Sequence, residues 1–270
     1  MFTLCAQERS TTSTVEPVEL SIARTTADLE DAFRLAYRSY LRSGLTKENP
    51  TGMRLTPYHF LPTTEVMLAK LQGISLSTAT LILDGELGLP AEAIYASEID
   101  SLRNKGLRLA EVGCLADQRE SPVRFLKMFR QLSTLIAQAA ANRGCNGLIA
   151  ATHPKHAKFY IRHLGFEIFG DVRACPYAQG NPAVALLMDF EQLRGSEIHT
   201  HLFGKPYSEG VLQGHRWDVE THDHFQTIWQ QSQVATQAMN SHSTDPACER
   251  LAVIQDAVEE LIGEKVAEQS

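Results

Sequence analysis

The chain has 270 residues, 43% of them hydrophobic, which is enough to form one large α/β domain with an appendage. Its formal net charge of −7 at pH 7 argues against a general nucleic-acid-binding protein, because such domains are usually basic. The sequence contains no apolar run long enough to span a bilayer and no secretion signal, so we expect a cytoplasmic protein. Its five cysteines include no C-x-x-C pair, so we expect no disulfide framework.

The first third of the chain predicts a tail, a helix and a hairpin. Residues 1–15 are polar and rich in Ser and Thr, which is typical of a flexible tail. Apolar residues recur at helical spacing over 28–42, and threonines just before them can cap the helix. A loop rich in Pro and Gly follows. Two β-prone runs, 65–71 and 74–83, then flank a Gln-Gly turn pair and predict an antiparallel hairpin.

The middle of the chain predicts the rest of the sheet. Residues 86–106 are predicted to be irregular. The elements expected after them are a strand at 107–116, a helix at 122–142, a strand at 148–152, a helix at 154–164, and strands at 166–172 and 182–190. This order predicts an α/β fold of three layers (α+β), with a mixed, mostly antiparallel sheet and helices on both faces.

Residues 195–270 differ in character from the rest and predict a helical C-terminal extension. Helical stretches are expected at 225–239 and 246–267, which pack on the domain or form a homodimer with a second copy. The extension also contains two His-x-His pairs. We expect no metal site there, because rings two residues apart on a helix point apart and no other ligand pair has suitable spacing.

Six short segments carry a resemblance to a known family. They are, in chain order, Leu55–Thr64 (LTPYHFLPTT), Gly88–Pro90 (GLP), Leu109–Val112 (LAEV), His153–His156 (HPKH), Phe159–Tyr160 and Gly165–Phe166. Their order and spacing resemble the FeeM-type N-acyl amino acid synthases, relatives of the acyl-homoserine lactone synthases that have the GNAT acyltransferase fold. The resemblance covers about residues 20–193.

This resemblance has implications for activity and partners. It implies a GNAT-like acyltransferase domain at 16–194 and no cofactor beyond the donor, a long-chain acyl group on the phosphopantetheine of an acyl carrier protein. The acceptor would be an amino acid or a similar small amine. It also implies that a central strand segment approaches the acyl chain and the thioester, namely Val112, Gly113, Cys114 and Leu115.

Glu111 is the first catalytic candidate. Strand alternation places it on the same face as Leu107, Leu109 and Leu115, where a carboxylate is unusual. Burial raises the pKa of a carboxyl group, and an amine acceptor needs a group that binds it and takes its proton. The alternative is a structural carboxylate paired with an arginine such as Arg34 or Arg108.

The segment after this strand bears on the donor. Ordinary GNAT enzymes bind the pyrophosphate of coenzyme A in a glycine-rich turn at the start of the next helix. Residues 116–123 (ADQRESPV) contain no glycine and two acids, which favours a carrier protein over coenzyme A. Basic residues on or before that helix (Arg119, Arg124 and Lys127) can attract an acidic carrier protein, or simply form a solvated helix face.

Tyr160 and His156 are the other catalytic candidates. Tyr160 invites comparison with the tyrosine that protonates the departing thiolate in many GNAT enzymes, although its spacing to Gly165 is one residue longer than usual. The alternative for Tyr160 is core packing. His156 lies one turn earlier and can contact Tyr160 or the donor, or be bound by backbone at the helix start.

The acceptor pocket is predicted at the first helix and the following loop. Arg34, Tyr37, Tyr40 and Arg54 supply aromatic walls and guanidinium groups that bind carboxylates. The chain departs from the family pattern at Ser77-Thr78 and at Gly113-Cys114, which puts donor length and turnover in question. Two alternatives stay open, a coenzyme A-dependent acetyltransferase and a non-catalytic protein that holds an acylated carrier or a lipid.

Overall fold

A computed structural model describes residues 18–118 and 122–239. One seven-stranded sheet runs through them in the order β1-β2-β3-β4-β5-β7-β6. All neighbouring strands pair antiparallel except β4 and β5, which are parallel. The strands are β1 (Glu19–Ile22), β2 (Thr64–Leu71), β3 (Ile74–Leu83), β4 (Leu109–Asp117), β5 (Gly147–Thr152), β6 (Glu167–Ala174) and β7 (Pro182–Asp189).

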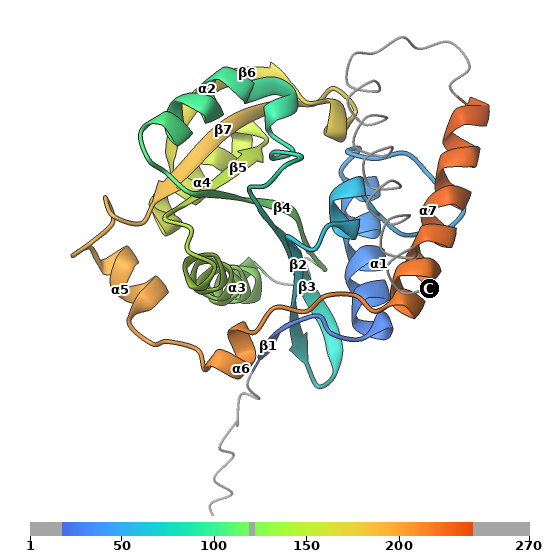
Figure 1. Cartoon of the computed structure of the whole chain (residues 1–270), viewed down its shortest axis with the longest axis horizontal. Coiled ribbons are helices and arrows are strands. Elements are labelled where there is room, and N and C mark those ends of the chain that lie inside the picture. Colours follow the sequence, from blue (N-terminus) through green and yellow to red (C-terminus); the bar gives the residue numbers. More distant parts are fainter. Residues whose placement is uncertain (1–17, 119–121, 240–270) are drawn as a thin grey trace, which may run out of the picture.

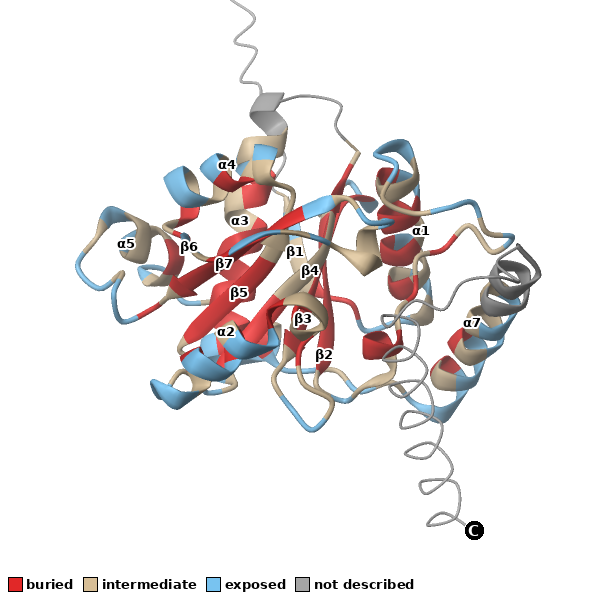
Figure 2. Cartoon of the chain, turned by 90° about the horizontal axis from the view of Figure 1, so that it is seen from above, coloured by how far each residue is buried: buried red, intermediate tan, exposed pale blue. Residues whose placement is uncertain are grey.

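Helices cover both faces of the sheet, as Figures 1 and 2 show. The helices are α1 (Thr26–Arg42), α2 (Glu92–Asn104), α3 (Pro122–Asn142), α4 (Pro154–Leu164), α5 (Glu197–Phe203), α6 (Glu209–Leu212) and α7 (Val219–Met239), with short 3-10 turns at Pro57–Phe60 and Pro176–Ala178. Alternate strand residues divide between the layers: Met67 and Leu81 pack with α3, whereas Val66 and Leu68 pack with α1. The predicted three-layer, mostly antiparallel fold is confirmed.

Local sequence signals account for several of the predicted boundaries. The Thr25 side chain accepts a hydrogen bond from the Asp28 N–H at 3.1 Å and caps α1. Gln72 and Gly73 both have positive φ, as a two-residue hairpin between β2 and β3 requires. Gly165, with φ of 70°, ends α4 in the left-handed conformation that glycine adopts most readily.

Four elements were not predicted. Residues 86–106, expected to be irregular, contain α2, whose Tyr95, Ile99 and Leu102 are buried. That expectation is wrong because a kink at Tyr95 and only a narrow apolar stripe weaken the helical pattern. The edge strand β1 and the helices α5 and α6 were also missed, since each is too short to show a period.

The C-terminal extension packs on the domain through α7. Phe225 is fully buried, and its ring meets the ring of Phe33 on α1 at 5.1 Å between centroids. Figure 1 shows α1 and α7 side by side. The expected tail at 1–15 and the expected helix at 246–267 lie outside the described residues.

Candidate active site

A cavity opens where β4 and β5 separate. The two parallel strands pair only at Leu109 with Gly147, Ala110 with Leu148, and Glu111 with Ile149. Beyond Glu111 the strands diverge, and their ends line a cavity of about 490 Å³. This volume lies within the range of roughly 300 to 1,000 Å³ that is usual for small-molecule sites.

A β-bulge shapes the β4 wall of this cavity. Thr80 on β3 faces Gly113, but Thr78 faces Ala116, so β4 carries one extra residue between these pairs. Cys114 has φ of 49°, a left-handed conformation that is uncommon outside glycine. The bulge interrupts strand alternation, and Leu115 packs with Val112 on the α3 side. The expectation that Leu115 shares a face with Glu111 is therefore wrong.

Aromatic and polar side chains line the cavity from several elements. They are Tyr40 from α1, Phe125 and Phe129 from α3, Lys155, His156, Phe159 and Tyr160 from α4, and Cys175 from the loop after β6, together with Val112, Gly113, Cys114 and Leu115. The four β4 residues predicted to approach the donor thus lie together on one wall. An apolar wall of phenylalanines suits a hydrocarbon chain.

Glu111 lies at the point where the strands part. It pairs across the sheet with Ile82 and Ile149, which belong to the cluster packed under α2. Its side chain is buried, and burial raises the pKa of this carboxyl to about 8, with the Glu92 carboxylate adding to the rise. A backbone hydrogen bond from the Ala91 N–H to Oε2, 2.7 Å long, acts in the opposite direction.

An arginine partner for Glu111 is not found among the described residues. Arg34 forms an ion pair with Glu30 at 2.6 Å, and the Arg108 side chain donates to the Gly144 carbonyl. The structure therefore does not show the arginine pair that the structural alternative requires. Among the described residues, no cation lies against this buried carboxyl to stabilise its ionised form.

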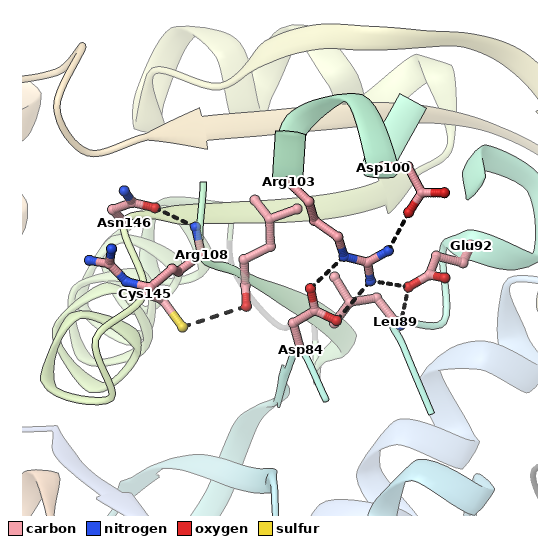
Figure 3. A network of polar contacts seen from close by, with 9 residues as sticks. Asp84, Leu89, Glu92, Asp100, Arg103, Arg108, Cys145 and Asn146 are labelled. Atoms are coloured by element: carbon pink, nitrogen blue, oxygen red, sulfur yellow. Dashed lines mark hydrogen bonds and ion pairs between the residues drawn. The ribbon is translucent and has the colours of Figure 1, made fainter. Parts of the chain in front are cut away.

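The turn that precedes α2 fixes the hydrogen-bond donor to Glu111. Gly88 has φ of 66°, and a Cβ there would meet the Glu92 carboxylate at 2.4 Å. That carboxylate accepts from the Leu89 N–H at 2.7 Å and pairs with Arg103, which also holds Asp84 and Asp100 (Figure 3). The network ties the turn to the end of β3, and so positions the N–H of Ala91.

Tyr160 both packs in the core and faces the cavity. Its ring lies against Phe129 and Phe166, with centroids 5.3 Å and 5.6 Å away. Burial raises the pKa of its hydroxyl to about 12, whereas a hydrogen bond with the Thr152 side chain acts to lower it. His156 also lines the cavity, and its ring centroid is 6.3 Å from that of His153.

The predicted acceptor residues separate into two groups. The Arg54 guanidinium stacks over the ring of Tyr40 at 4.2 Å from its centroid, and Tyr40 lines the cavity. Tyr37 is buried, and its hydroxyl accepts from the Asn49 N–H at 3.1 Å. Of these four, only Tyr40 is among the described residues that line the cavity, and Arg54 reaches it through the Tyr40 ring.

The predicted basic residues of the donor side can be placed only in part. Lys127 is exposed on α3, and Arg124 is in the first turn of that helix, where only the backbone is described. Arg119 lies outside the described residues. Sequence patterns missed a further exposed cation at the cavity, Lys155, which carried no signal beyond its position in the HPKH segment.

Two further residues of the site were missed. Cys175 lines the cavity from the loop after β6, where nothing local in the sequence indicates a site. Ala91 contributes its backbone, so its side chain carries no signal, although the preceding Gly-Leu-Pro was noted as a motif.

Among the described residues, no group of three or more His, Cys, Asp and Glu side chains is arranged to hold a metal ion. No described helix has an apolar stretch that could span a membrane.

Comparisons with known proteins agree with this geometry. The family model described as N-acyl amino acid synthase FeeM matches residues 31–189, more than half of the chain. The structure of FeeM, an N-acyl amino acid synthase from uncultured soil microbes, is similar at 23% identity and a TM-score of 0.55, over 66% of this chain and 92% of that one. The AHL synthase LasI is similar at 18% identity and a TM-score of 0.50, over 72% and 97% of the two chains. No curated protein matches.

The chain has the GNAT fold. This follows from its mixed sheet, whose two parallel strands separate at the cavity, and from its similarity to these two structures. Within this class, the family match is specific. The chain belongs to the FeeM family of N-acyl amino acid synthases and is an N-acyltransferase.

Proposed function

We propose that the chain transfers a long-chain acyl group from the phosphopantetheine of an acyl carrier protein to the amine of an amino acid. The observation that carries the mechanism is the buried Glu111 carboxyl at the point where β4 and β5 part, with its pKa raised to about 8. A base with a pKa near the working pH is well matched to take a proton from an amine.

The reaction balances as follows. The acceptor reacts as its neutral amine, after its ammonium has lost one proton to water. The nitrogen attacks the thioester carbonyl carbon and forms the C–N bond while the ionised form of Glu111 takes a proton from nitrogen. The carbonyl oxygen then carries negative charge, and backbone N–H groups in the β4 bulge stabilise it, since the ladder with β3 leaves Cys114 and Leu115 without partner residues. The C–S bond breaks, and the Tyr160 hydroxyl, which faces the cavity, protonates the departing thiolate.

The acyl chain and its carrier have separate binding features. Phe125, Phe129 and Phe159 pack together, with centroid distances of 4.8 to 5.8 Å, and face the cavity. Burial of a hydrocarbon chain there contributes about 0.8 kcal/mol for each CH₂ group. Exposed Lys155 lines the cavity, and exposed Lys127 lies on α3 between Phe125 and Phe129 in the sequence, so both add positive charge that suits an acidic carrier protein.

Carrier protein is favoured over coenzyme A because residues 116–123 lack the glycines of a pyrophosphate-binding turn. A single phosphodiester, as in phosphopantetheine, does not need that turn. A protein that only holds an acyl carrier would not need a buried carboxyl with a raised pKa beside the cavity.

The test is mass spectrometry of lipids extracted from a host that overproduces the chain. We expect N-acyl amino acids that are absent from the same host producing the Glu111→Gln variant at equal soluble level. Identical lipid profiles from the two strains would refute the proposed reaction.

A further inference from the structure

Arg54 is a cation without a counter-charge among the described residues. Its Nη2 donates to the Tyr177 carbonyl at 3.0 Å, and its guanidinium stacks on Tyr40. Its Nε is buried without any hydrogen-bond partner. Arg54 as a whole is half-buried, but a guanidinium nitrogen that is buried without a partner is costly, so a fold that keeps one has a reason to do so.

The charge of Arg54 reaches the groups around it. Burial, together with the Arg54 cation, lowers the pKa of His59 to about 3. Burial raises the pKa of Tyr40, and Arg54 acts against that rise. No described carboxylate pairs with this positive charge, which leaves it available to an anion.

Arg54 and Glu111 both influence the pKa of the same residue, Cys175. Burial raises the pKa of the Cys175 thiol, the Glu111 carboxylate raises it further, and the Arg54 cation lowers it. Arg54 stacks on Tyr40, which lines the cavity together with Cys175 and with Val112, the residue after Glu111. The side chains of Arg54 and Glu111 are not themselves among the described residues that line it. This arrangement complements the two charges of a free amino acid.

We infer that Arg54 binds the carboxylate of the acceptor, with the Tyr40 ring holding the guanidinium in place. The inference rests on the proposed function and assigns the residue that recognises the acceptor's carboxylate. It separates Arg54 from Arg34, whose guanidinium is already paired with Glu30.

The experiment compares free amino acids with their C-terminal amides. Acyl carrier protein loaded with a long acyl chain is the donor, each of the common protein amino acids is tested in turn, and the best acceptor is repeated as its amide. The variants are Arg54→Gln, which removes the charge, Arg54→Lys, which keeps it, and Arg34→Gln as a control that loses an arginine already paired with Glu30.

The wild type is expected to prefer the free acid over the amide. Arg54→Gln should lower kcat/KM for the acid by about 10- to 100-fold through KM and leave the amide unchanged, because only the acid makes the charged contact. Arg54→Lys should recover part of the preference, and Arg34→Gln should keep all of it. The KM for the acylated carrier should stay constant in all variants.

Three outcomes would overturn the inference. They are a wild type that uses acid and amide equally, an Arg54→Gln variant that loses both alike at an unchanged thermal midpoint, and a KM increase for the acylated carrier instead of the acceptor. The first outcome is measured on the wild type alone, so the inference can be tested even if the Arg54→Gln variant folds poorly. If the wild type still makes N-acyl products from the carrier, the proposed function stands while the carboxylate assignment fails.

Discussion

A carboxyl group held between Ile82 and Ile149 is more stable protonated than ionised, because burial removes the water that would solvate its charge. The folded-state pKa of Glu111 is about 8, against an ordinary value of 4.5. The folded chain therefore binds a proton at Glu111 more tightly than the unfolded chain does. The associated stability is fully present below pH 4.5 and is lost as the pH rises through about 8.

Glu111→Gln should separate the catalytic from the structural role of this side chain. Glutamine keeps the shape and still accepts from the Ala91 N–H, so the variant should fold. Without a base, kcat/KM should fall by about 10²- to 10⁴-fold. Activity and thermal midpoint are to be measured on the same preparation, and a stable, fully active variant would remove Glu111 from the mechanism.

The stability difference between Glu111→Gln and wild type should depend on pH. Because only the wild type must ionise a buried carboxyl, the variant should gain relative stability between pH 5 and about 8.5, by on the order of a few kcal/mol. Urea denaturation at both pH values measures this difference. A difference that does not change with pH would mean that Glu111 is not protonated in the folded protein.

Tyr160→Phe tests the proton donor to the leaving thiolate. Phenylalanine retains the ring contacts with Phe129 and Phe166, so the thermal midpoint should change little. Loss of the hydroxyl should lower kcat by about 10²-fold. Unaltered turnover would assign Tyr160 to core packing alone, which is the alternative that its helical spacing also predicts.

At the scale of single elements, β4 and the start of α2 form the proposed site together. β4 supplies Glu111 and, through its bulge, the cavity wall, while the turn before α2 supplies the Ala91 N–H. Arg103 connects the two by holding Asp84 at the end of β3 and Glu92 at the start of α2. We therefore expect the network around Arg103 to control catalysis from outside the cavity.

Arg103→Met should uncouple the turn from the sheet. Loss of three ion pairs in a half-buried network should lower the free energy of unfolding by about 1 to 3 kcal/mol and reduce kcat. Loss of a well-placed Ala91 N–H should also shift the pKa seen in the kcat/KM profile upward, because that hydrogen bond lowers the pKa of Glu111.

Arg194→Met is the matched control for Arg103→Met. Its single ion pair with Glu191 is exposed, at 69% for the arginine side chain, so stability should change by less than about 0.5 kcal/mol. Equal effects of the two substitutions would contradict a special role for the Arg103 network.

The sequence predicts these elements unevenly. The helix that became α1, the β2–β3 hairpin, α3 and α4 follow from strong periodicity and from turn or cap residues such as Thr25 and Gly165. The β4 bulge has no such signal, since one extra residue depends on the partner strand. Strand alternation therefore places Glu111 correctly with Leu109 and misplaces Leu115.

The site itself is only partly visible in the sequence. An acid within an apolar strand identifies Glu111, but the Ala91 N–H and Cys175 belong to segments that come together only through the fold. The choice between Arg34 and Arg54 also needs the structure, because both are arginines in the same region and only the Glu30 contact of Arg34 distinguishes them.

At the scale of the whole molecule, the described part of the C-terminal extension supports the acyltransferase domain from outside. The family match ends at residue 189, whereas α7 lies beyond it and closes an aromatic cluster on α1. Phe225 and Trp217 complete that cluster over Phe33, with centroids of their rings 5.0 to 6.2 Å apart. The extension thus shields the helix that carries Tyr40.

Phe225→Ala measures how much α7 contributes to the free energy of unfolding. The substitution should lower the free energy of unfolding by about 3 to 5 kcal/mol, because it empties a fully buried aromatic site. Val219→Ala, at a position on α7 that is 58% exposed, should change it by less than about 0.5 kcal/mol. If both variants unfold at the wild-type denaturant midpoint, α7 does not stabilise the domain.

The central claim is that this N-acyltransferase takes its acyl group from a carrier protein. The most direct measurement is the initial rate of N-acyl amino acid formation by the purified chain, with the same long acyl group on acyl carrier protein or on coenzyme A. The account predicts a much higher kcat/KM with the carrier protein, since residues 116–123 offer no glycine turn for pyrophosphate. Equal values of kcat/KM with the two donors would contradict it.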